Sequence, residues 1–252
     1  MDNVDVDVLQ HDVEMAARLQ ASLLPRTCPA SCNNHDIWAL NRMCSGVGGD
    51  FYDFIPINND QLAIVVGDVV GHGIRAAMIM AQIMGMIRTE TDRIGRPAQM
   101  FEMLNSQLVD LGNKLNTVIT CTMFYIVLDS PSATAYFVNA GHIMPIICGN
   151  SDEDFRCVGG SDLVLGVENF EPHQGCHMFV PGERLVLYTD GIVEAKGVGG
   201  ELFGSARLQE TLDRYRGDTP EQCAEGVLDA VDVFRMGRER HDDETIMVID
   251  RI

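Results

Sequence analysis

Four aspartates, each at one end of an apolar run or in a glycine-rich turn, constrain this chain more than any other feature. They are Asp50, Asp68, Asp190 and Asp242, in segments 48–53, 66–73, 187–191 and 241–245. Carboxylates at strand ends can converge at one edge of a sheet, where they repel one another in a low dielectric. A hard divalent cation with oxygen ligands, Mg²⁺ or Mn²⁺, is the usual relief. The chain is therefore expected to bring distant acids together around a cation.

Composition excludes several classes of function. The 252 residues suffice for one large domain or two small ones, and 46% hydrophobic content can build a sizeable core. The formal charge of −19 argues against nucleic acid as a partner and against anionic membranes. There is no apolar run of 18 residues and no basic, apolar leader. The sequence therefore predicts a cytoplasmic protein that does not bind or span a membrane.

The eight cysteines are scattered, and in a cytoplasmic protein most of them are expected to be reduced core or surface thiols. Four residues near the N-terminus could instead bind zinc: Cys28, Cys32, His35 and Cys44. Their spacing fits no standard zinc-binding pattern.

Residues 9–24 are predicted to form a helix, because Met15, Leu19 and Leu23 recur along one narrow stripe. Pro25 ends it, and a loop or linker follows. The helix can pack on its own domain or pair with a second copy as a coiled coil. It spans only about two heptads, which is short for an isolated coiled coil.

Strands dominate from residue 36 onwards. Runs 51–57 and 61–68 are predicted to form a hairpin around an Asn-Asn-Asp turn. The hairpin is expected to bring Asp50, Asp53 and Asp68 near one another.

Helices are expected in two blocks between the strands. The first block holds helices 74–92 and 97–115, and the methionines of the earlier one are expected to fill the core. These are Met78, Met80, Met84 and Met86. The second block holds helices 205–215 and 220–235, after a glycine-bearing loop 193–204. Further strands are expected at 37–43, 117–128, 134–139, 144–148, 176–180, 184–189 and 244–250. The pattern indicates an α+β fold with helices outside stacked antiparallel sheets.

Two histidines accompany the acidic segments. His72 lies between Gly71 and Gly73, and His142 follows Asn-Ala-Gly. Each can be read as a metal ligand, as a general acid or as a hydrogen-bonded structural residue. Mg²⁺ and Mn²⁺ prefer oxygen ligands, which favours the structural reading.

Five motifs occur in order along the chain, and they are written here in one-letter code. They are GGDFYD (48–53), GDxxGHGxxAA (67–77), NAGHxxP (139–145), YTDGIxEA (188–195) and DDxT (242–245). Together they resemble the SpoIIE/RsbU-type bacterial serine/threonine phosphatases of the metal-dependent PPM, or protein phosphatase 2C-like, superfamily. The resemblance covers about residues 14–252.

The resemblance implies an α-β-β-α sandwich and two or more Mn²⁺ or Mg²⁺ ions. Asp68 would bridge two ions, and Asp53 and Asp243 would contact metal-held water or a further ion. Asp50 and the carbonyl of Val69 would serve the first ion, and Asp190 and Asp242 the second. A water activated by the ions would attack phosphorus in line, without a covalent phospho-enzyme.

The resemblance also implies a substrate and a domain organisation. Residues 1–25 would be a linker or switch helix, and residues 26–252 the phosphatase domain. The substrate would be a phosphorylated STAS-type anti-sigma-factor antagonist, and control would come through the helix, a homodimer or an upstream regulator. The alternatives are a non-catalytic metal-binding docking module and a phosphatase of a small phosphorylated metabolite.

Overall fold

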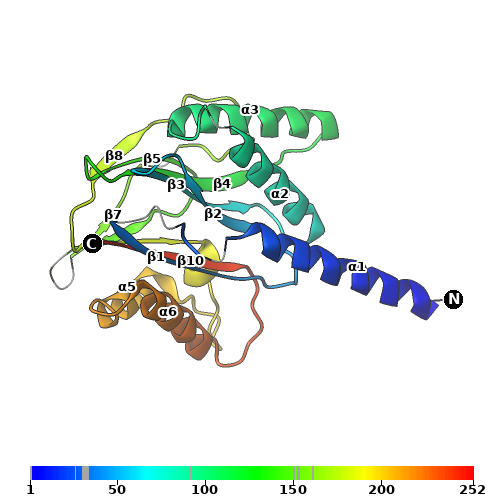
Figure 1. Ribbon diagram of the computed structural model, residues 1–252. Coiled ribbons are helices and arrows are strands. Elements are labelled where there is room, and N and C mark those ends of the chain that lie inside the picture. Colours follow the sequence, from blue (N-terminus) through cyan, green and yellow to red (C-terminus); the bar gives the residue numbers. More distant parts are fainter. Residues whose placement is uncertain are drawn as a thin grey trace.

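The structure is a computed structural model that describes residues 2–25, 27–29, 34–90, 92–149, 151, 154–160 and 162–252. Two five-stranded antiparallel sheets are stacked face to face, and helices cover the outer face of each (Figure 1). The α+β sandwich predicted from the sequence is confirmed.

Strand order places the ends of distant strands at a common edge. The first sheet contains, in order, β2 (Asp50–Pro56), β3 (Gln61–Val69), β4 (Cys121–Asp129), β5 (Thr134–Ala140) and β8 (Gly175–Met178). The second contains β1 (His35–Arg42), β10 (Glu244–Arg251), β9 (Arg184–Tyr188), β6 (Ile146–Cys148) and β7 (Phe155–Cys157). The expected hairpin forms from β2 and β3, and its register pairs Asp50 with Asp68.

Two helix pairs bury the outer faces of the sheets. They are α2 (Ile74–Thr89) with α3 (Pro97–Leu115) on the first sheet, and α5 (Gly204–Arg214) with α6 (Pro220–Arg235) on the second. Both α3 and α6 begin with proline, whose missing N–H costs nothing at a first helical position. Thr219 and Gln222 form a capping box that fixes where α6 starts.

Helix α1 (Asp2–Leu23) projects from the body and docks only by its last turns (Figure 1). Leu24 is buried in the core, and the Tyr52 hydroxyl donates to the Pro25 carbonyl at 3.0 Å. Further out, Val8, Met15 and Leu19 remain exposed. The helix therefore packs on its own domain at one end and keeps an apolar stripe open to solvent.

The turn expected at Asp190, after β9, is a short helix, α4 (Asp190–Val193). Two other sequence expectations need correction. Met80 and Met84 are buried as expected, but the side chain of Met78 is 69% exposed. Finally, Cys28 is disulfide-bonded, so its thiolate is not available to the suggested zinc site, and Cys32 lies outside the described residues.

The rest of the zinc group offers no alternative centre. His35 is buried and stacks on Phe179, and Cys44 is a free thiol. The other described cysteines are free, as expected.

Among the helices that the structure describes, none combines the length and apolar character needed to cross a membrane. The cytoplasmic location stays a prediction.

Candidate functional site

The first sheet contributes two facing carboxylates. Asp50 begins β2 and Asp68 lies directly opposite it near the end of β3, so both point to the same side of the sheet. Gly49 permits this arrangement, because a side-chain carbon there would lie 2.4 Å from the Val69 carbonyl oxygen. The strand end thus exposes the Val69 carbonyl beside two acids.

Asp50 is fixed from across the sandwich by two threonines of the second sheet. The hydroxyls of Thr189 and Thr245 donate to its Oδ2, at 2.7 and 2.5 Å. Burial and then the Asp68 carboxylate raise the pKa of Asp50 well above its ordinary value, while the threonine hydroxyls lower it. The two sheets are therefore joined at this edge through one buried carboxylate.

The second sheet contributes three more acids. Asp190 starts α4 directly after β9, and Asp242 and Asp243 precede β10. Asp243 is buried and accepts the backbone N–H groups of Cys44, at 2.8 Å, and of Gly49, at 3.0 Å. The hydrogen bond from Gly49 connects the Asp242–Asp243 turn to the glycine loop that carries Asp50.

Glycines at 48 and 191 allow the close approach of these turns. A side-chain carbon at Gly48 would lie 1.7 Å from Oδ2 of Asp243, and one at Gly191 would lie 1.9 Å from the Asp243 carbonyl oxygen. The glycines of two predicted motifs are thus required by packing around one aspartate.

Asp68 lies at the electrostatic centre of the group. Burial and the carboxylates of Asp190, Asp242 and Asp243 raise its pKa to about 7. The pKa values of Asp190 and Asp242 are also raised, chiefly by burial. Acids from both sheets therefore destabilise one another's charged forms, and a cation would relieve this repulsion.

The carboxylate cluster, defined here as Asp50, Asp68, Asp190, Asp242 and Asp243, has the donors that Mg²⁺ and Mn²⁺ prefer. Within the described part of the chain, no set of three or more His, Cys, Asp or Glu side chains is arranged so that it could hold a metal ion as it stands. The donor chemistry and the mutual repulsion fit a divalent cation, and its binding would require the carboxylates to draw together.

Asp53 does not join this cluster. It lies on the opposite face of β2, where its Oδ2 accepts a 2.6 Å hydrogen bond from Nε of Arg88 on α2. Side chains three positions apart on a strand point to opposite faces, so the expectation that Asp53 lies near Asp50 and Asp68 at the site is corrected.

The histidines have different surroundings. His142 is buried, and its Nδ1 lies 3.0 Å from the Thr122 hydroxyl, while Asn139 binds its backbone on both sides. Burial lowers the pKa of His142 to about 4, so the ring is neutral at pH 7. His72 is exposed on the loop after β3, near enough to Asp242 to offset a small part of the rise that burial causes in the pKa of that carboxyl.

Sequence reasoning missed the residues that support the acids. Asn41 donates to the hydroxyl of Thr245 at 2.8 Å, which in turn binds Asp50. Gln20 of α1 binds both backbone groups of Gly48, donating to the carbonyl at 2.7 Å and accepting from the N–H at 3.1 Å. Only the threonines carried a signal, because Thr189 adjoins Asp190 and Thr245 closes the last motif.

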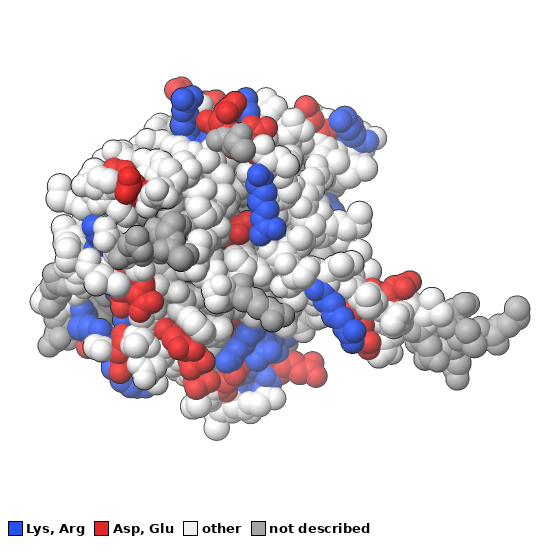
Figure 2. Space-filling view, viewed as in Figure 1, with Lys and Arg blue, Asp and Glu red and all other residues white. Residues whose placement is uncertain are grey.

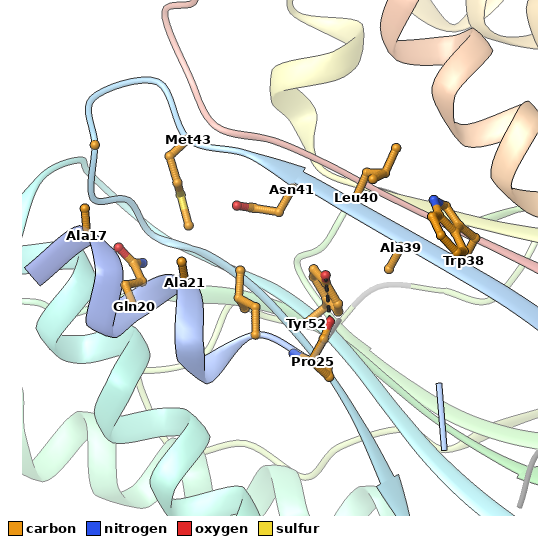
Figure 3. A pocket seen from close by; sticks show the side chains of 12 residues that line it. Ala17, Gln20, Ala21, Pro25, Trp38, Ala39, Leu40, Asn41, Met43 and Tyr52 are labelled. Carbon is orange, nitrogen blue, oxygen red and sulfur yellow. Dashed lines mark hydrogen bonds between the residues drawn. The ribbon is translucent and has the colours of Figure 1, made fainter. Parts of the chain in front are cut away.

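A pocket of about 310 Å³ separates α1 from β1, and Gln20 and Asn41 are among the residues that line it. Figure 3 shows Gln20 and Asn41 on its two sides, with the Tyr52–Pro25 hydrogen bond at one end. Asn41 is linked to the cluster through Thr245, and Gln20 is linked to it through Gly48 and Gly49, so both walls of the pocket are connected to the site by hydrogen bonds.

Known proteins are similar to this chain in sequence. The chain is 25% identical over 244 residues to phosphoserine phosphatase RsbU of Bacillus subtilis (strain 168), a match covering 96% of this chain and 71% of RsbU. It is 23% identical to phosphoserine phosphatase RsbP of the same organism, covering 96% of this chain but 58% of RsbP.

Solved structures agree with the observed architecture. The SiaA-PP2C domain of Pseudomonas aeruginosa superposes with a TM-score of 0.85 at 21% identity, over 100% of both chains. RsbX, solved in complex with magnesium, gives a TM-score of 0.64 at 14% identity, over 86% of this chain and 94% of that one.

The sandwich, the acidic edge and these relatives define a serine/threonine phosphatase of the PP2C-like class. The match to the Stage II sporulation protein E (SpoIIE) family spans residues 58–252, and the chain belongs to that family.

Proposed function

We propose that this protein is a metal-dependent phosphatase that removes phosphate from a serine or threonine of a regulatory protein. The observation that carries the proposal is the convergence of acids on Asp68, whose pKa is raised to about 7 by burial and by three carboxylates of the other sheet. The magnesium complex of RsbX supports a divalent cation in this fold.

Each ligand has a proposed place. Asp50, Asp68, Asp190, Asp242 and the Val69 carbonyl would hold the Mn²⁺ or Mg²⁺ ions, with Asp68 as the ligand shared between the two sides of the site. Asp243, already bound by two backbone N–H groups, would keep the loops in position rather than serve as a main ligand. Bound ions of this kind acidify water and offset the negative charge of phosphoryl oxygens.

The chain's own residues prepare the site for an in-line displacement. Thr189 and Thr245 hold one oxygen of Asp50, leaving the other for a ligand. Gly49 keeps the Val69 carbonyl close to both acids. The sequence has no cysteine-nucleophile motif, which disfavours a cysteine-based phosphatase.

The proposed substrate is a phosphorylated STAS-type protein in a partner-switching pathway. The support is similarity to RsbU and RsbP, both named as phosphoserine phosphatases. Residues 1–25 are proposed as a switch helix on a phosphatase domain of residues 26–252, because Gln20 binds Gly48 next to the cluster. The exposed stripe of α1 would pair with a second copy or an upstream regulator.

The test is turnover of a phosphoserine protein and of an aryl phosphate, each with and without Mn²⁺. Asp68→Asn is expected to lower the metal-dependent rate on both substrates by on the order of a thousandfold, because it removes the shared ligand. Asp110→Asn, on the exposed face of α3, is the matched control and should retain most of the rate.

Three results would contradict the proposal. A rate that is independent of metal would rule out the cation, and an unchanged rate in Asp68→Asn would rule out the cluster. Metal binding without turnover of either substrate would instead support the docking module, and turnover of small phosphate esters alone would support the metabolite phosphatase.

A further inference from the structure

Four large apolar side chains are exposed beside the carboxylate cluster. Val70 is 60% exposed, Ile74 51%, Met78 69% and Val118 63%. They lie on the loop after β3, on the first turns of α2 and on the segment before β4. These four residues are called the apolar rim.

The rim adjoins the cluster through the backbone. Val70 directly follows Val69, whose carbonyl oxygen lies against Gly49 next to Asp50. The Val70 N–H donates to the Thr120 carbonyl at 3.1 Å, which keeps the segment containing Val118 beside this loop. A substrate seated at the cluster would therefore have the rim at its side.

Apolar exposure on α2 is confined to the end near the site. Ile74 and Met78 are one turn apart on the solvent face, and the next positions of that face are Gln82 and Gly85. The opposite face of α2 is buried in the core. Exposed apolar residues that gather in one place mark an interaction surface more often than scattered ones.

The charge of the molecule points to apolar contacts as the source of substrate affinity. With a net charge of −19, the protein gains little from long-range attraction to an anionic phosphoprotein. On the face shown in Figure 2, acidic and basic side chains are interspersed around wide uncharged areas. Burial of methionine and isoleucine side chains is favourable whatever the charge of the partner.

We propose that the apolar rim binds apolar residues flanking the phosphoserine of a protein substrate. The inference rests on the proposed phosphatase function and adds a determinant of specificity to it. Positions two to four residues from the phosphoserine, which an extended chain places roughly 7–13 Å away, are the ones tested for this contact. A free phosphorylated metabolite would not reach the rim.

The experiment compares three substrates in the presence of Mn²⁺. Two are phosphoserine peptides of equal length and charge, one with leucine and one with serine at the positions two to four residues on either side. The third is p-nitrophenyl phosphate. We expect the wild-type protein to show about a tenfold higher kcat/KM for the leucine peptide, the factor expected from burying part of one or two side chains.

The double variant Ile74→Gln, Met78→Gln is expected to lose this preference and to keep its rate on p-nitrophenyl phosphate. Glutamine is close to methionine in size and adds no charge, so repulsion of the peptide does not change. Val233→Gln, at a position on α6 that is 76% exposed, is the control and should keep the preference.

Equal turnover of the two peptides by the wild-type protein would overturn the rim proposal while leaving the phosphatase function intact. The proposal would also be overturned if the double variant lost the same fraction of its rate on all three substrates. It would be overturned as well if the double variant kept the preference for the leucine peptide. A double variant that changes from dimer to monomer by light scattering would show that the rim joins copies of the chain. Absence of turnover on every substrate would contradict the phosphatase function itself, and the rim's role with it.

Discussion

At the scale of single residues, Asp50 shows how the site depends on neighbours that are distant in sequence. One of its oxygens is held by Thr189, which directly follows β9, and by Thr245 on β10. The Thr245 N–H also donates to the Thr189 hydroxyl, at 3.0 Å. A buried carboxylate with donors from both strands has a defined orientation, which a metal ligand requires.

Thr245→Val tests this support. The variant leaves Asp50 with one hydroxyl donor fewer and is expected to lower metal affinity and kcat by about ten- to a hundredfold. It should also lower the free energy of unfolding by about 1–3 kcal/mol, because a buried acceptor loses its partner. Titration calorimetry with Mn²⁺ and urea unfolding measure the two effects.

Thr211→Val is the control, because the Thr211 hydroxyl is also buried but binds a helix carbonyl far from the cluster. The interpretation would be wrong if both variants lost stability and the metal affinity of Thr245→Val matched that of the wild type.

At the scale of elements, the end of α1 is coupled to the glycine loop. Gln20 forms two hydrogen bonds with Gly48, and the next residue, Gly49, donates to Asp243. The Arg88 side chain links the same helix end to α2, since it binds both the Leu23 carbonyl and Asp53. Movement of α1 would therefore reach the cluster through the backbone.

Gln20→Ala should weaken Mn²⁺ binding and lower turnover by about tenfold, because the Gly48 backbone loses two hydrogen bonds. Gln10→Ala, on the exposed outer part of the same helix, should behave as the wild type. Deletion of residues 1–24 is expected to change turnover or oligomeric mass. If turnover and mass were both unchanged by the deletion, the switch role of α1 would be refuted.

At the scale of the whole molecule, the acids oppose the stacking of the two sheets when they are ionised. Asp50 and Asp68 belong to one sheet, and Asp190 and Asp242 to the other. The pKa of each of the four is raised in the folded protein. In the window between the ordinary and the raised values, the folded state binds more protons than the unfolded state.

Stability of the metal-free protein is therefore expected to fall as pH rises from about 4 to about 7. With the pKa of Asp68 raised from 3.8 to about 7, this one group accounts for up to about 4 kcal/mol. Urea unfolding in EDTA at several pH values measures the slope. Asp68→Asn should flatten it, and Asp110→Asn on the exposed face of α3 should not.

Added Mn²⁺ should reverse the effect by joining the sheets, raising Tm at pH 7.5 in proportion to the logarithm of its concentration. Stability that increases with pH in EDTA would contradict the repulsive cluster. The repulsive cluster would also be contradicted if Mn²⁺ raised the Tm of Asp68→Asn as much as that of the wild type.

The sequence by itself determined which acids were candidates for a common site and which class of fold carries them. Apolar periodicity predicted helix 97–115 and the antiparallel strands, because each pattern matches one repeat of side-chain direction. Glycines beside Asp50, Asp68 and Asp190 marked turns where backbones approach closely, and the structure brings these turns together. Such features are local, so they can be read from neighbouring residues.

Only the tertiary structure decided what lies opposite each side chain. It separated Asp53 from the cluster and paired it with Arg88, exposed Met78 beside the site, and brought Gln20 to Gly48. It also joined Asp50 to two threonines, one 139 and one 195 residues away. These contacts depend on strand register and on how helices cross the sheets, which are set by packing of the whole core rather than by any local pattern.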